Sequence, residues 1–140
     1  MWRTRTQWII ALLLVGGAGA AGAIAQEPVD PEVKQVILRQ LAAFRAGDYR
    51  AAYAFASREI QARFDVEAFE HMVKAGYPQI ARSTHAWVNA GRSTPDGALH
   101  VSVRIRGADG TFIRAVYEMV REAPGWRING VAARPDPGTI

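Results

Sequence analysis

Two stretches of alternating apolar and polar residues in the second half of the chain predict a β-hairpin. In residues 99–106, apolar side chains alternate with polar ones, which is the pattern of a strand with one buried face. Residues 113–119 repeat this alternation, and the glycine-containing segment 107–110 joins the two stretches. We therefore expect a half-buried antiparallel pair at the centre of the domain.

The length of the connecting loop decides whether the two apolar faces coincide. A three-residue loop with Gly110 in the left-handed conformation pairs Ile105 with Ile113 and Val101 with Tyr117. A two-residue turn would instead place apolar side chains opposite charged ones. We predict the first register, because it buries one face and leaves the other polar.

The first half of the chain shows the period of amphipathic helices. Apolar residues in 33–44 fall on one helical face, and shorter helical segments are expected in 49–56, 57–64 and 65–76. Each segment follows a residue that can cap its first turn. These residues are Asp30, Asp48, Ser57 and Asp65.

Two further strands are expected on either side of the hairpin, at residues 83–90 and 126–134. The turn before the last strand brings Ile128 opposite Met119, which keeps apolar residues together. Helices first and antiparallel strands afterwards predict an α+β fold, with the N-terminal helices packed on a curved antiparallel sheet.

The first 25 residues have the composition of a secretory signal peptide. Arg3 and Arg5 form a basic start, residues 8–15 an apolar core, and residues 23–25 an A-x-A cleavage site. We therefore predict a periplasmic or secreted protein. The alternative is a retained membrane anchor, since the apolar stretch extends to the cleavage site.

Cleavage would leave one domain at residues 26–134 and a flexible tail at 135–140. The net charge of the mature chain, residues 26–140, would be +2, because it has 15 basic and 13 acidic residues. So small and scattered a charge argues against nucleic-acid binding, although a weak attraction to anionic lipid headgroups stays open. The chain has no cysteine, which excludes disulfides and thiol chemistry. Membrane contact is expected only through the signal peptide before cleavage.

Several short motifs recur in one known family. They are Gln40-Leu41-Ala42-Ala43-Phe44, Ala51-Ala52-Tyr53-Ala54-Phe55-Ala56-Ser57, Gly76-Tyr77-Pro78 and Trp126-Arg127-Ile128-Asn129-Gly130. Through them the chain resembles, over about residues 33–134, an uncharacterised bacterial family known only as a domain of unknown function. The resemblance implies the cystatin-like fold of nuclear-transport-factor-2-like proteins and ketosteroid isomerases. In that fold a cone-shaped cavity between helices and sheet often holds a ligand.

Four residues are candidates for ligand binding: Tyr53, Tyr77, Arg82 and Tyr117. Tyr53 and Tyr117 could donate hydrogen bonds inside the cavity, and Tyr77 with Arg82 could hold an anionic group at its mouth. The alternative is a structural role, with the tyrosine hydroxyls satisfied in the core. The apolar face of the hairpin carries no carboxylate or histidine, so we predict a non-catalytic domain without a cofactor. It would bind a small apolar or amphipathic ligand or a partner protein.

The alternative function is a small-molecule isomerase or dehydratase of the ketosteroid-isomerase-like type. His71, with Glu67 four residues earlier on the same helical face, or His85 could supply the acid or base, together with a tyrosine. The three histidines lie on separate predicted elements, so their spacing gives no metal motif.

The polar face of the predicted sheet is a candidate dimer interface. It carries Ser102, Arg104, Arg114 and Glu118. A homodimer through this face is the third hypothesis that the sequence supports.

Overall fold

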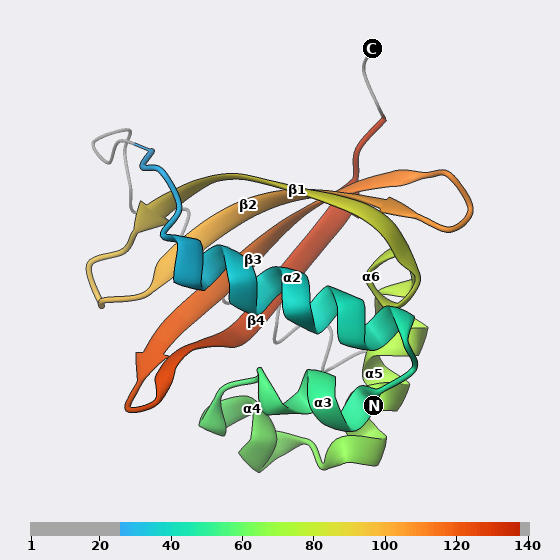
Figure 1. Cartoon of the computed structure of the whole chain (residues 1–140), viewed down its shortest axis with the longest axis horizontal. Helices are drawn as coiled ribbons and strands as arrows, with labels where there is room; N and C mark the ends of the chain where they lie inside the picture. The colour runs from blue at the N-terminus through green and yellow to red at the C-terminus, as the bar shows by residue number, and fades with distance from the viewer. Residues whose placement is uncertain (1–25, 138–140) are drawn as a thin grey trace.

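The computed structural model describes residues 26–137, in which five helices lie on one face of a four-stranded sheet (Figure 1). The helices are α2 (Pro31–Arg45), α3 (Tyr49–Ala54), α4 (Arg58–Arg63), α5 (Val66–Gly76) and α6 (Pro78–Ala81). The strands are β1 (Ser83–Ser93), β2 (Leu99–Gly107), β3 (Phe112–Glu122) and β4 (Gly125–Pro135), antiparallel and in the order β1-β2-β3-β4. The predicted α+β fold is confirmed.

Part of the prediction concerns residues outside this range. The expected signal peptide at 1–25 lies outside the described residues. Within residues 26–137, none of the helices has the length and apolar character needed to cross a membrane.

The four predicted capping residues begin the first four helices. Asp30 accepts a hydrogen bond from the Glu32 amide at 2.7 Å, and Asp65 accepts one from the Ala68 amide at 2.8 Å. Asp48 and Ser57 cap α3 and α4 in the same way. Each cap satisfies an amide that the helix itself leaves unpaired.

The hairpin has the predicted register. Ile105 lies opposite Ile113 and Val101 opposite Tyr117, and Gly110 adopts a φ of 86° in the loop. All four paired side chains lie in the core, 5% exposed or less. Loop geometry and burial therefore favour the same alignment.

The long helix α2 crosses the buried face of the sheet (Figure 1). Val33, Ile37 and Leu41, all fully buried, lie on its inward stripe. They form one core cluster with the inward residues of β2 and β3. Burial of each such side chain contributes about 1.5–3 kcal/mol, so this stripe anchors the helical layer.

The last strand and its contacts reach beyond residue 134, where the tail was predicted to begin. Strand β4 continues to Pro135, and the Asp136 amide donates to the Phe112 carbonyl at 3.0 Å. The Asp136 carboxylate lies 3.1 Å from Nε of Arg104 and 3.4 Å from an amino group of Arg114. Pro135 and Asp136, which the sequence assigned to the tail, therefore contact the sheet.

Candidate functional site

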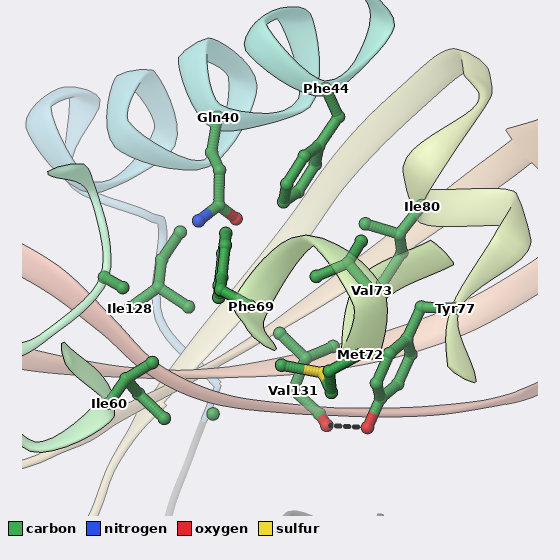
Figure 2. Close-up of a pocket in the computed structure, with 12 residues that line it drawn as sticks. Gln40, Phe44, Ile60, Phe69, Met72, Val73, Tyr77, Ile80, Ile128 and Val131 are labelled. Carbon is green, nitrogen blue, oxygen red and sulfur yellow. Dashed lines mark hydrogen bonds between the residues drawn. The ribbon is translucent and has the colours of Figure 1, made fainter. Parts of the chain in front are cut away.

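A partly open cavity of about 50 Å³ lies between the helices and the buried face of β4 (Figure 2). Its walls come from α2, α5, α6, the segment around α4, and β4. They are formed by Gln40, Phe44, Ala56, Ile60, Phe69, Met72, Val73, Tyr77, Ile80, Ile128, Gly130 and Val131. Gln40 and Tyr77 contribute the polar side chains, and the rest of the lining is apolar.

Tyr77 is positioned by the break between two helices. Gly76 ends α5 and Pro78 begins α6, so Tyr77 lies at the junction and turns its ring inward. Its hydroxyl donates to the Val131 carbonyl at 3.1 Å, as Figure 2 shows. Burial raises the pKa of Tyr77 to about 12, so the hydroxyl stays protonated at neutral pH.

Gln40 is the second polar group of the cavity, and it was not among the predicted site residues. It is 4% exposed, and its side-chain amide donates to the Ala52 carbonyl at 3.1 Å. The signal was present in the sequence, because Gln40 is the polar residue within the otherwise apolar stripe of α2. Its hydrogen bond connects α2 to α3 beside the cavity.

Tyr117 lies near the same cavity wall without lining it. It is fully buried opposite Val131 in the sheet, and it interacts electrostatically with Tyr77. Its hydroxyl has no hydrogen-bond partner among the described residues. Burial raises the pKa of Tyr117 well above its usual range, so this group too stays protonated.

The other two candidate residues lie elsewhere. The Tyr53 hydroxyl donates to the Phe64 carbonyl at 2.5 Å, and its ring packs edge-on against Phe69. Arg82 is exposed, beside a separate surface hollow next to Asp109. Of the four candidates, the structure brings Tyr77 to the cavity and Tyr117 close to it.

Neither histidine proposed for acid–base chemistry is part of the cavity wall. His71 is exposed on α5. His85 is exposed on the other face of the sheet, where its ring stacks on Trp87 with 5.8 Å between centroids. The cavity wall carries no carboxylate or imidazole among the described residues.

The polar face of the sheet is more buried at Glu118 than the alternating pattern predicts. Glu118 is 7% exposed, and its Oε1 accepts a hydrogen bond from the Asn129 amide at 2.9 Å. Oε2 lies 3.8 Å from Nε2 of His100. The His100 ring, followed by Asn129, lowers the pKa of Glu118. This carboxylate is therefore paired and largely shielded from water.

Asn129 connects this carboxylate to the helical layer. The register of β3 with β4 shifts between Glu118 and Met119, and Asn129 is the unpaired residue of the bulge. Its Oδ1 accepts a hydrogen bond from the Ser57 hydroxyl at 2.6 Å. Alternation alone gives no signal for a bulge, so this connection was not predictable from the sequence.

Helices covering one face of a curved antiparallel sheet, with a cavity between the layers, define the cystatin-like, nuclear-transport-factor-2-like class of α+β domain. The chain belongs to the family described as Domain of unknown function (DUF4864), which matches residues 26–140. The resemblance to an uncharacterised domain family is thereby confirmed.

Among solved structures, the chain is similar to the 1.8 Å structure of Aln2 from a Streptomyces species. The TM-score is 0.50 at 18% sequence identity, over 79% of this chain and 94% of that chain. At this identity the similarity shows the fold alone. Comparison with the curated proteins finds none that matches.

Proposed function

We propose that this protein is an exported, non-catalytic binding domain whose inner cavity receives the apolar end of a small amphipathic ligand. The apolar wall between α5, α6 and β4 is the observation that carries this proposal. Binding sites for small ligands combine a mainly apolar lining with a few polar groups that orient the ligand. Gln40 and Tyr77 are the polar groups here.

The size of the cavity limits what can enter it. Its volume of about 50 Å³ is well below the ~150 Å³ of an apolar cavity that binds benzene. It fits a few heavy atoms, such as the end of an acyl chain, while the polar part of the ligand stays outside. Met72 is flexible and lies at the wall, so its movement can enlarge the space.

The lining supports binding without catalysis. A ketosteroid-isomerase-like reaction needs an acid or base within hydrogen-bond reach of the substrate. Tyr77 is the titratable group on the described wall, and with a pKa of about 12 it is a poor base at neutral pH. The enzyme hypothesis therefore has less support from this geometry than the binding hypothesis.

Xenon and hexanol, followed by amide NMR shifts of the purified protein, test the cavity. We expect the shifts to concentrate in α5, α6 and β4, because xenon enters dry apolar cavities. Val131→Phe, which adds volume at the wall, should abolish them. Val116→Phe is the matched control, since Val116 lies one residue before Tyr117 on the opposite face of the sheet. Absence of shifts, or equal shifts in Val131→Phe, would contradict the proposal.

Export is tested separately by fractionating the source cells and sequencing the N-terminus of the purified protein. We expect a mature chain that begins at Gln26 outside the cytoplasm, as the A-x-A motif predicts. A cytoplasmic protein that retains residues 1–25 would contradict the export part of the proposal. It would leave the cavity experiment unaffected.

A further inference from the structure

A second hollow lies on the face of the sheet that the helices leave uncovered. This outer groove has a volume of about 320 Å³, within the usual range for small-molecule sites. It is lined by Gln26, Ala90, Gly91, Arg92, His100, Ser102, Arg114, Val116 and Arg134. It is therefore larger, more polar and more basic than the inner cavity.

The strand register places the basic residues of the outer groove at its two ends. Arg92 lies opposite His100 at one end, and Arg114 lies opposite Arg134 at the other. Between them Ser102 pairs with Val116 and forms a floor of small side chains. The two ends are four residues apart along a strand, which corresponds to about 13 Å.

The arginine end of the groove has an excess of positive charge. Arg104, Arg114 and Arg134 occupy directly paired positions on β2, β3 and β4. Like charges in such positions repel each other. Asp136 contacts Arg104 and Arg114, whereas Arg134 has no ion-pair partner among the described residues.

The other end of the groove holds an unused hydrogen-bond donor. Nε of Arg92 is shielded from solvent and has no hydrogen-bond partner in residues 26–137. A buried donor without an acceptor is costly, so an acceptor supplied by a ligand would be favourable at this end of the groove. The neighbouring His100 already faces Glu118, so Arg92 is the basic group at this end that has no ion-pair partner in the described part of the chain.

We propose that the outer groove binds an elongated small molecule with an anionic group, carboxylate or phosphate, at each end. One group would accept hydrogen bonds from Arg92, and the other from Arg134 and Arg114. This site lies on the opposite face of the sheet from the inner cavity, so the inference is independent of the proposed function.

The same geometry argues against two other occupants. A symmetric dimer whose two-fold axis passes through the arginine row would bring that row against its own copy, with like charges in contact. A flat lipid surface would reach Arg134, which is exposed, more readily than the half-buried Arg92. A narrow ligand that enters the groove can contact both ends.

Calorimetric titration with succinate, adipate and suberate, at constant ionic strength, tests the proposal. Acetate is the single-charge control, and a bisphosphonate of the same chain length as adipate distinguishes phosphate from carboxylate recognition. We expect saturable binding that is tighter for the longer dianions than for acetate. Weak binding of every probe, independent of its length, would overturn the proposal.

Variants locate the binding site. Arg134→Gln and Arg92→Gln should each weaken binding about fivefold or more, as expected for loss of a charge-assisted hydrogen bond. Val116→Phe should block the groove without changing the charge. Arg39→Gln removes one exposed charge on α2 and should change the affinity less than about twofold. Equal weakening by Arg39→Gln, or unchanged binding in Val116→Phe, would overturn the proposal.

Two further measurements test whether a second copy of the chain or a lipid surface occupies the outer groove instead. Light scattering should show a monomer for both the wild type and Arg134→Gln. In sedimentation with phosphatidylglycerol vesicles, the protein should show no vesicle binding that adipate can displace. A dimer that Arg134→Gln dissociates, or vesicle binding that adipate displaces, would overturn the small-molecule assignment.

Discussion

The side chain of Asn129 connects the helical layer to the far side of the sheet, and its replacement tests this connection. Asn129 is 7% exposed, accepts a hydrogen bond from Ser57 at 2.6 Å and donates one to Glu118 at 2.9 Å. Asn129→Ala removes both contacts. It also leaves a buried carboxylate with one fewer donor.

The cost of Asn129→Ala follows from the two hydrogen bonds. A neutral bond contributes about 0.5–1.5 kcal/mol and a bond to a charged group about 1.5–3 kcal/mol. We expect the free energy of unfolding to fall by about 2–4 kcal/mol, a large part of the 5–15 kcal/mol typical of a domain. Urea unfolding of the purified protein measures this change as a lower midpoint with an unchanged slope.

A double-mutant cycle with Ser57→Ala isolates the contact between the two side chains. Ser57→Ala alone also loses the cap of α4, which costs about 1 kcal/mol. The double variant should lose about 1 kcal/mol less unfolding free energy than the sum of the losses in the two single variants. Asn89→Ala is the control, because Asn89 is exposed on β1 and its loss should cost less than about 0.5 kcal/mol. Full additivity, or a cost for Asn129→Ala no greater than that of Asn89→Ala, would refute this reasoning.

Three further predictions concern stability. The lowered pKa of Glu118 stabilises the fold above the unfolded-state value near 4.5, and this contribution is lost as the pH falls through the folded-state pKa. Urea unfolding at several pH values should therefore show that the free energy of unfolding falls less at low pH in Glu118→Gln than in the wild type. An equal fall in both proteins would contradict the pairing of Glu118 with His100 and Asn129. Tyr117→Phe removes a buried hydroxyl without a partner and should leave stability unchanged or raise it, whereas Tyr77→Phe should lower it by about 1 kcal/mol in the same assay. Gly110→Ala forces a side chain into a positive φ of 86° and should lower the melting temperature, at a cost of about 1–2 kcal/mol.

The architecture was predictable because alternation and loop length constrain each other. One loop length makes the apolar faces of the central hairpin coincide, and the structure has the resulting pairs Val101–Tyr117 and Ile105–Ile113. The pairing of Met119 with Ile128 was predicted by the same reasoning and is confirmed. Periodicity therefore carries most of the information about the fold.

Features that interrupt periodicity were not predictable. The register shifts within β1 and next to Asn129 change which side chains share a face, and no residue type in the sequence predicts them. His85, a candidate acid or base, lies on the polar face of the sheet, where it pairs with Arg106 and stacks on Trp87. Strand β4 ends at Pro135, one residue past the predicted boundary, and an edge strand tolerates proline.

The candidate site was only partly predictable, because hydroxyl partners depend on the fold. The sequence identifies Tyr53 and Tyr77 as core tyrosines but does not show which carbonyl each one reaches. In the structure the Tyr53 hydroxyl donates to the Phe64 carbonyl, and the Tyr77 hydroxyl donates to the Val131 carbonyl at the cavity wall. Arg82 follows a short helix that turns it toward solvent, away from both tyrosines.

The position of Asp136 has a practical consequence for anyone who shortens or tags this chain. A recombinant version that stops at residue 134 would keep Arg104 and Arg114 side by side but remove the acidic group that now neutralises them. We expect that version to adhere more strongly to cation-exchange resin and to release β4 more readily at its end. Versions that extend through residue 137 carry their own counter-ion and are the better choice for purification.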